Sequence, residues 1–262
     1  MYHGIVSNIV INMYKKHPQF DTTRDDLQKI WRYMDFTKLV SLLDKKELYF
    51  SRADKLNDSF EGSFPKGTVE LRPFMYADLP KNVQETILKM WQPTYKNMLK
   101  ATFINSWHIN DYESAAMWKL YLQSNEGIAI QSDVGSLKKS FDGKDPRVIT
   151  IGDVKYIDYE KDFFPDNNTL YPYFHKRKSF EHEMELRAVT ISFPLKGDGV
   201  DFSVDLPDIG LYIPVDLNIL IKKIYVSPDS PKWFFKLVKA IKDKYGLKQD
   251  VLQSDLIKSP LF

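Results

Sequence analysis

The chain has 262 residues and no cysteine, and its 37 basic and 35 acidic residues give a formal net charge of +2 at pH 7. A chain of this length buries enough apolar surface to fold without disulfide bonds, and the absence of cysteine excludes thiol catalysis and thiolate metal sites. The near-balanced charge gives no general positive excess of the kind that marks many nucleic-acid-binding domains.

Two further absences set the expected compartment and cofactors. No apolar run is long enough to cross a bilayer, and residues 1–20 lack the basic start and small-residue cleavage site of a secretory signal peptide. The five histidines show no spacing typical of metal ligands. We therefore predict a cytoplasmic protein with no membrane partner and no metal site.

The first half of the chain predicts strands separated by helices. Leucines at helical spacing indicate a helix at 35–47. Residues 78–100 predict a helical insertion in two pieces, because Pro93 interrupts the helical pattern. Asn110 and Glu113 form a capping-box pattern at the start of a helix over 113–123. The other predicted elements are strands at 26–33, 48–54, 101–107 and 127–134, and a polar loop at 56–63.

The second half continues the mixture without a regular alternation of strand and helix. A charged helix and turn at 136–146 and an aromatic loop at 162–172 precede a predicted helix at 174–183, which leads into a long strand at 184–193. Further strands are predicted at 154–159, 209–215, 221–227 and near the end, with a helix at 233–246. This order favours an α+β fold over a doubly wound fold, as a single domain over residues 1–262 with helices around mixed central sheets.

A charged row at the start of the 184–193 strand is the strongest candidate for chemistry. Because side chains alternate along a strand, Glu183, Glu185 and Arg187 are expected to share one face, with Met184 entering the core. Paired carboxylates can stabilise a sugar cation, and their mutual repulsion can raise one pKa. The other interpretation is an exposed strand face whose charges pair with neighbouring strands.

A polar segment after the 48–54 strand is a second candidate, for substrate binding. Ser51, Arg52, Asn57 and Asp58 lie there, where loops often carry function. The Arg52 guanidinium suits a phosphate or carboxylate. Asn57 and Asp58 are more often plain turn residues, because both tolerate a left-handed backbone.

Aromatic residues make up 14% of the chain, which indicates either a sheet-rich core or a cleft that stacks a base. Trp107, Trp118 and Tyr121 lie close in sequence, and core packing is the simpler role for Trp118. Glu113 is a candidate for a polar cleft or for the capping box, and Ser114 is a candidate for a polar cleft or for an ordinary residue of the first helical turn. Lys176, in the basic run 175–179, is a candidate for phosphate binding or for an exposed face.

Five segments in the same order resemble the bacterial family known as domain of unknown function 2971. They are WRY at 31–33, LYFSRADKLNDSFEG at 48–62, SWHINDYESAAMWKLY with EGIAI at 106–130, KRKSFEHEMELR at 176–187 and IYVSP at 224–228. The positions that match this family include Arg32, Tyr33, Glu61 and Met117 besides the candidates above. The layout is also similar to the ADP-ribosyltransferase superfamily, although the Ser-Thr-Ser pattern of that superfamily's middle strand is absent.

The resemblance implies chemistry at an N-glycosidic bond. In the superfamily pattern, Arg32 or Tyr33 would stand on the early strand, Ser51 or Ser106 in the middle, and Glu183 or Glu185 on the late strand. The first expectation is a DNA glycosylase that acts on a phage or modified base in antiviral defence and needs no cofactor. The alternatives are a transferase with NAD as substrate, acting on nucleic acid or protein, and a non-catalytic nucleotide sensor. DNA or a nucleotide is the expected partner.

Overall fold

The computed structural model describes residues 14–20, 25–122, 124–141, 143, 145–197, 199–204 and 206–261. Most of the N-terminal segment, for which we predicted no signal peptide, lies outside these ranges. Within them, no helix is both long enough and apolar enough to span a membrane.

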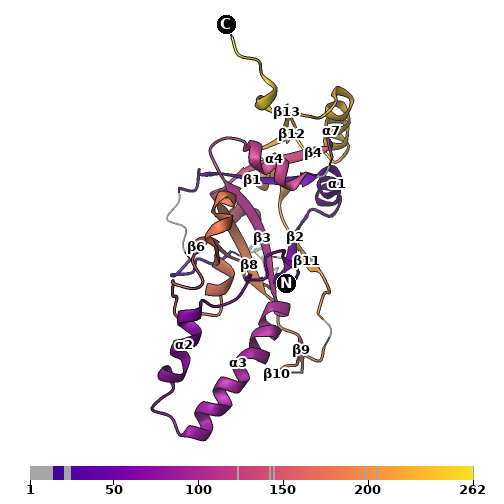
Figure 1. The fold of residues 1–262 in the computed structure, drawn as a ribbon. Helices are drawn as coiled ribbons and strands as arrows, with labels where there is room; N and C mark the ends of the chain where they lie inside the picture. Colours follow the sequence, from indigo (N-terminus) through magenta and orange to yellow (C-terminus); the bar gives the residue numbers. More distant parts are fainter. Residues whose placement is uncertain are drawn as a thin grey trace, which may run out of the picture.

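A nine-stranded sheet forms the centre of the molecule (Figure 1). Among the described strands of this sheet, β12 and β13 are parallel neighbours and the other pairs are antiparallel, so the predicted α+β class with a mixed central sheet is confirmed. The strands are β1 (Lys29–Asp35), β2 (Glu47–Arg52), β3 (Thr102–Ile109), β4 (Gly127–Asp133), β5 (Thr150–Asp153), β8 (Glu185–Ile191), β11 (Gly210–Pro214), β12 (Lys223–Val226) and β13 (Asp250–Gln253). Two small pairs, β6 (Lys155–Ile157) with β7 (His175–Arg177) and β9 (Leu195–Lys196) with β10 (Gly199–Val200), lie apart from it.

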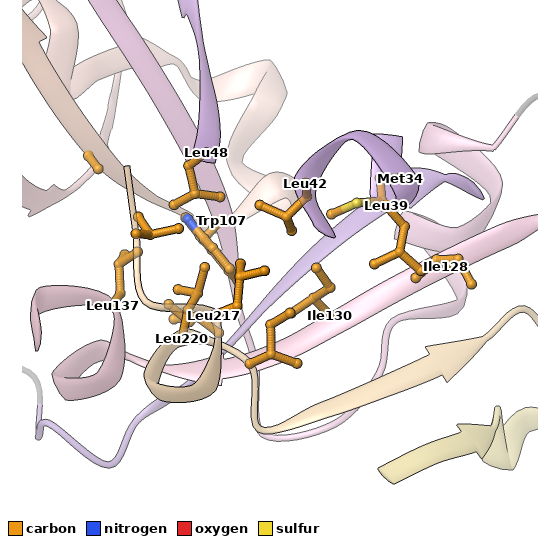
Figure 2. Close-up of a cluster of buried hydrophobic side chains, with 14 of the residues drawn as sticks. Met34, Leu39, Leu42, Leu48, Trp107, Ile128, Ile130, Leu137, Leu217 and Leu220 are labelled. Atoms are coloured by element: carbon orange, nitrogen blue, oxygen red, sulfur yellow. The ribbon is translucent and has the colours of Figure 1, made fainter. Parts of the chain in front are cut away.

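Helices surround the sheet, and four of them pack against one of its faces to form the main hydrophobic core. The helices are α1 (Phe36–Lys45), α2 (Lys66–Met75), α3 (Lys81–Ala101), α4 (Ala115–Tyr121), α5 (Val134–Ser140), α6 (Leu217–Leu220) and α7 (Lys232–Lys244). Apolar side chains of α1, α5, α6 and α7 join alternate residues of the strands in one cluster, part of which Figure 2 shows. Leu186 and Ala188 of β8 enter this cluster, so Glu185 and Arg187 point to the opposite face.

The insertion is longer and more regular than predicted. α2 and α3 form a hairpin that projects from the sheet (Figure 1), and the sequence analysis missed α2. The predicted break at Pro93 is wrong, because α3 runs continuously through it. Pro93 is exposed, and so is Lys89, the residue whose carbonyl has no amide donor at position 93.

The predicted helix at 174–183 is also wrong. Residues 175–177 form β7, which pairs with β6, and η3, a short 3-10 turn, covers Lys178–Glu183. Met184 then takes a left-handed conformation with φ of 43° and ends the turn. Glu183 therefore lies before β8 rather than on it, and Met184 is 46% exposed instead of entering the core.

Candidate functional site

The central sheet forks along one edge of β3. On that edge β1 pairs with β3 only at His108 and Ile109, and β2 pairs with β3 only at Phe103 and Ile104. The other edge of β3 pairs with β8 continuously from Thr102 to His108. The stretch of β3 between the two partners offers its edge to side chains, and the Arg32 Nη1 of β1 donates to the Ser106 carbonyl oxygen at 2.7 Å.

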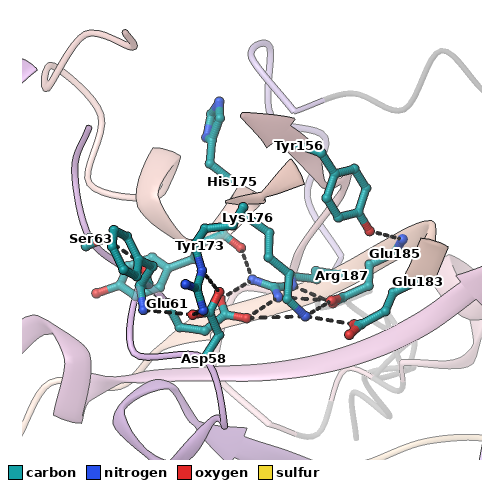
Figure 3. A network of polar contacts seen from close by, with 12 residues as sticks. Asp58, Glu61, Ser63, Tyr156, Tyr173, His175, Lys176, Glu183, Glu185 and Arg187 are labelled. Atoms are coloured by element: carbon teal, nitrogen blue, oxygen red, sulfur yellow. Dashed lines mark hydrogen bonds and ion pairs between the residues drawn. The ribbon is translucent and has the colours of Figure 1, made fainter. Parts of the chain in front are cut away.

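The charged row beside β3 is buried, so the interpretation as an exposed strand face is wrong. Glu185 is 5% exposed and Arg187 is 1% exposed. Their side chains share a face as predicted, with Arg187 Nε donating to Glu185 Oε2 at 2.7 Å (Figure 3).

Glu61, from the loop after β2, completes the pairing of Arg187. The guanidinium donates to both Glu61 oxygens, at 2.8 and 2.7 Å, and to the Tyr173 carbonyl at 2.9 Å. The loop reaches this position through Gly62, whose φ is 69° and whose position would bring an added Cβ within 2.5 Å of Leu99 Cδ2. Bidentate contacts with two carboxylates leave Arg187 fully satisfied.

Lys176 of β7 connects the Glu183 carboxylate to Glu185 and Glu61, the two partners of Arg187. Its Nζ donates to Glu183 Oε2 and to Glu185 Oε1, both at 2.7 Å, and lies 3.7 Å from Glu61 Oε1. We call these five residues the charged cluster: Glu61, Lys176, Glu183, Glu185 and Arg187 (Figure 3). It contains three carboxylates and two cations, so its charges do not balance when all are ionised.

The excess of one carboxylate over the two cations affects mainly the pKa of Glu183. Burial alone would raise the pKa of Glu185, but the Arg187 guanidinium and Lys176 hold that pKa well below its usual range. Burial and the neighbouring Glu185 raise the pKa of Glu183 to about 7, against the opposing effect of Lys176. Glu183 is therefore the member of the cluster that exchanges a proton near neutral pH.

Backbone contacts hold Glu183 at this position. His108 Nδ1 lies 2.7 Å from the Glu183 carbonyl oxygen, and the Ile109 amide donates to the Met184 carbonyl at 2.8 Å. Burial lowers the pKa of His108, which favours the neutral imidazole donating to that carbonyl. The next amide, that of Glu185, donates to the Tyr156 hydroxyl at 2.8 Å.

Tyr121 lies near the Glu183 and Glu185 carboxylates, and Arg32 lies near Tyr121. Burial raises the pKa of the Tyr121 phenol, and the charges of Glu183 and Glu185 raise it further. The positive charge of Arg32 lowers it. Burial lowers the pKa of Arg32 to about 10. Among the residues that the structure describes, no carboxylate lies within ion-pair distance of Arg32. A guanidinium in this state suits an anionic ligand.

The other candidates after β2 have mainly local partners. Arg52 is 8% exposed and donates to both Asp54 oxygens, at 2.6 and 3.0 Å, and to the Pro207 carbonyl. Asp58 accepts from Arg177 Nη2 at 2.5 Å and from the Phe60 amide, and so ties the loop to the end of β7. Ser51 is half-buried on β2, and Asn57 is exposed.

Three of the four candidate aromatic residues are buried, in two separate hydrophobic clusters. Trp107 lies in the main core at 1% exposure, and its Nε1 donates to the Asn105 side chain at 2.7 Å. Tyr33 and Trp118 pack edge to face, with centroids 5.0 Å apart, in a second cluster with Trp31. These rings leave little surface for stacking a base, whereas Tyr121 is 44% exposed.

Ser114 and Glu113 have structural partners, and the predicted capping box is wrong. Ser114 is the N-cap of α4, where its Oγ accepts from the Met117 amide, and its own amide donates to the Tyr33 hydroxyl at 2.7 Å. Glu113 accepts from Trp118 Nε1 at 2.9 Å, from Ser254 Oγ at 2.6 Å and from the Asp255 amide at 2.6 Å. Glu113 thus fixes the segment after β13 to α4.

The structure brings Glu183, Glu185, Arg187 and Lys176 into one cluster, with Arg32 and Tyr121 nearby. Sequence reasoning named Glu61 only as a position that matches the family, without a role in the site, and left out His108 and Tyr156. The Glu61–Gly62 pair, a charge before a glycine in a predicted loop, was the available signal for Glu61. His108 and Tyr156 act through backbone groups, which no sequence pattern reveals. Within the described ranges, no group of histidine, aspartate and glutamate side chains is arranged to hold a metal ion.

No family model and no curated protein sequence matches the chain. Among solved structures, it is similar to Thermus sp. 2.9 DarT in complex with NAD+, at 11% identity and a TM-score of 0.40 over 90% of this chain and 100% of that chain. The complex with carba-NAD+ gives 10% and 0.39 over 88% and 97%, and the complex with ADP-ribosylated ssDNA gives 9% and 0.38 over 90% and 97%. At these values the likeness shows neither a shared family nor a shared activity.

Proposed function

We propose that this chain is an enzyme that breaks the N-glycosidic bond of NAD and transfers ADP-ribose to nucleic acid. One observation carries the proposal. Arg32 has no carboxylate partner among the described residues, and Glu183 has a pKa raised to about 7; the charges of both shift the pKa of the Tyr121 phenol, in opposite directions. An anion-binding group and a carboxylate that changes charge near neutral pH thus belong to one site.

Each residue has a distinct role in this reaction. Arg32 binds the pyrophosphate of NAD, because a guanidinium pairs with phosphate oxygens through several hydrogen bonds. The ionised Glu183 stabilises the positive charge that develops on the ribose as the bond between C1′ and the nicotinamide nitrogen breaks. Both electrons of that bond leave with nicotinamide. A nucleophilic atom of the acceptor then bonds to C1′ and releases its proton.

Glu185 is a positioning residue in this proposal. Arg187 and Lys176 occupy its oxygens, and its pKa lies well below the usual range, so it keeps its charge and its place as Glu183 titrates. Its fixed charge is one reason that the pKa of Glu183 is raised. The charged cluster therefore sets the proton affinity of the group that meets the sugar.

NAD fits these residues better than a flipped base does. A glycosylase stacks its extruded base between accessible aromatic or apolar surfaces. Trp107, Trp118 and Tyr33 are at most 8% exposed and pack against other core residues. The exposed Tyr121 ring near Glu183 keeps the DNA glycosylase as a second candidate, since one ring is available to contact a base.

The test is to identify the product by mass spectrometry. The purified protein is incubated with NAD alone, with single-stranded DNA alone, and with both, and the E183Q variant provides the matched control. The proposal expects free nicotinamide whenever NAD is present, and DNA heavier by one ADP-ribose only when both are present. A freed base from DNA alone would establish the glycosylase instead. Neither product would favour a nucleotide sensor and overturn both enzymatic assignments.

A further inference from the structure

The C-terminal helix α7 and the turn after it concentrate positive charge. Between Lys232 and Gln249 the sequence has six lysines and one acidic residue, Asp243, although the whole chain has a net charge of only +2. The rest of the chain is therefore net negative. The charge on α7 is a local feature that the overall composition conceals.

The lysines lie on the solvent side of α7. Lys232, Lys236 and Lys239 are spaced four and three residues apart, so they share one face over about 10 Å of helix. All three are exposed, as are Lys244 and Lys248. Among the residues that the structure describes, none of these five has a carboxylate within ion-pair distance. The partly buried Lys242, by contrast, pairs with Asp243 at 2.7 Å.

The other face of α7 is already used by the fold. Phe234 and Val238 are fully buried in the main core, and the Phe234 ring packs against Phe36 with centroids 5.3 Å apart. An interfacial membrane helix inserts its apolar face among lipids, which α7 is not free to do. The lysine face therefore fits a polyanion in water better than it fits a lipid surface.

An exposed tryptophan at the start of α7 indicates which kind of polyanion this face would bind. Trp233 is 56% exposed and lies three residues before Lys236, so its ring borders the lysine face. A tryptophan beside lysines suits single-stranded nucleic acid, in which bases are free to stack on the ring while the lysines contact phosphates. A duplex keeps its bases stacked inside and offers this ring little.

We propose that the α7 face formed by Lys232, Trp233, Lys236 and Lys239 binds single-stranded nucleic acid without regard to sequence. α7 packs on the face of the sheet opposite Glu185 and Arg187, so this surface is separate from the charged cluster. It anchors the strand and takes no part in bond breaking. The inference stands on binding alone and does not depend on the proposed reaction.

The α3 helix provides a matched control. Lys81, Lys89 and Lys96 are also exposed on a helix, at the far end of the molecule from α7 (Figure 1). K232Q/K236Q/K239Q and K81Q/K89Q/K96Q therefore change the net charge equally. Any difference between the two variants reports the position of the charge rather than its amount.

The experiment measures binding of a fluorescent single-stranded oligonucleotide of mixed sequence by anisotropy over a range of salt concentrations. The α7 variant is expected to bind about 10 to 100 times more weakly near 0.1 M salt, with the slope of log K against log salt reduced by about 2. The α3 variant should stay within about threefold of the parent. W233A should weaken single-strand binding about tenfold and change duplex binding much less.

Equal losses in the two lysine variants, or no loss in the α7 variant, would overturn the inference. Nicotinamide release from NAD without DNA is measured on the same preparations and is expected to be unchanged in the α7 variant. If the parent releases no nicotinamide but the α7 and α3 variants still differ in binding, the proposed reaction fails and the binding surface stands. Thermal unfolding of each variant confirms that the fold is retained.

Discussion

The two ends of the charged row differ in how completely they are paired. At one end Arg187 makes five hydrogen bonds, to two carboxylates and a backbone carbonyl, and is 1% exposed. At the other end the Glu183 carboxyl has Lys176 as its cation and shares that cation with Glu185. The paired end keeps its charges fixed, whereas the underpaired end acquires a pKa near 7.

This difference shows that residue type alone does not assign a role in such a row. Glu183 and Glu185 are two positions apart, yet the pKa of one is raised and that of the other is lowered. The cause is the distribution of two cations among three carboxylates. We therefore expect substitutions at the paired end to affect stability and those at the underpaired end to affect chemistry.

The largest expected effect is on stability, from R187M. Removing the guanidinium leaves Glu61 and Glu185 buried without their main partner, which costs about 3 to 5 kcal/mol. This is a large part of the roughly 5 to 15 kcal/mol that stabilises a typical domain. Urea unfolding measures the loss. Adding E61Q and E185Q to R187M should restore part of it, and no restoration would show that buried charge is not the cause.

The next effect is on substrate binding, from R32Q. Arg32 donates to one backbone carbonyl and has no carboxylate partner among the described residues, so the fold should lose only about 1 kcal/mol. The KM for NAD should rise about 10- to 100-fold, because the pyrophosphate loses its guanidinium. R32K is the matched control and should recover part of the loss. An unchanged KM in R32Q would remove Arg32 from the site.

The pH dependence of stability isolates Glu183. The folded-state pKa of about 7 lies above the ordinary value of 4.5 for a glutamate, so the stabilising effect of the protonated carboxyl is complete below about pH 4.5 and lost as pH rises through 7. Relative to E183Q, the parent should therefore lose about 2 kcal/mol between pH 5 and pH 8. Urea unfolding of both proteins at the two pH values measures this. Parallel pH profiles would contradict the raised pKa.

The smallest effect is expected from R177Q. Arg177 pairs with Asp58 at 2.5 Å, but the Arg177 side chain is 37% exposed. Water can therefore solvate part of the Asp58 carboxylate when the guanidinium is removed. The unfolding free energy should fall by about 1 kcal/mol, well below the loss in R187M. Urea unfolding of the two variants side by side compares one arginine with the other. Equal losses would show that burial does not distinguish the two arginines.

Most of the sheet was predictable from sequence because its strands are marked by alternating or continuous apolar residues. The predicted strands at 48–54, 101–107 and 127–134 correspond to β2, β3 and β4, and the helices at 35–47 and 233–246 correspond to α1 and α7. The errors fall where local patterns compete with tertiary contacts. β7 reads as part of a helix, but it pairs with β6, which precedes it by about 20 residues.

The site was predictable in its residues but not in its arrangement. Glu185 and Arg187 share a face because strand alternation is local and reliable. The position of Glu183 depends on the left-handed backbone of Met184, a non-glycine residue that gives no sequence signal for such a turn. The pairing of Arg187 with Glu61 joins residues 126 positions apart and follows only from the fold.

The rate of nicotinamide release from NAD by the parent, E183Q and E185Q, measured at pH 8 beside the unfolding free energy of each, tests the division of roles most directly. The account predicts that E183Q keeps its fold and loses about 100-fold or more in rate, since a carboxylate that stabilises the transition state is removed. E185Q should lose about 3 kcal/mol or more of stability, since it unbalances a buried network. An E183Q variant with the parent's rate, or an E185Q variant with the parent's stability, would contradict it.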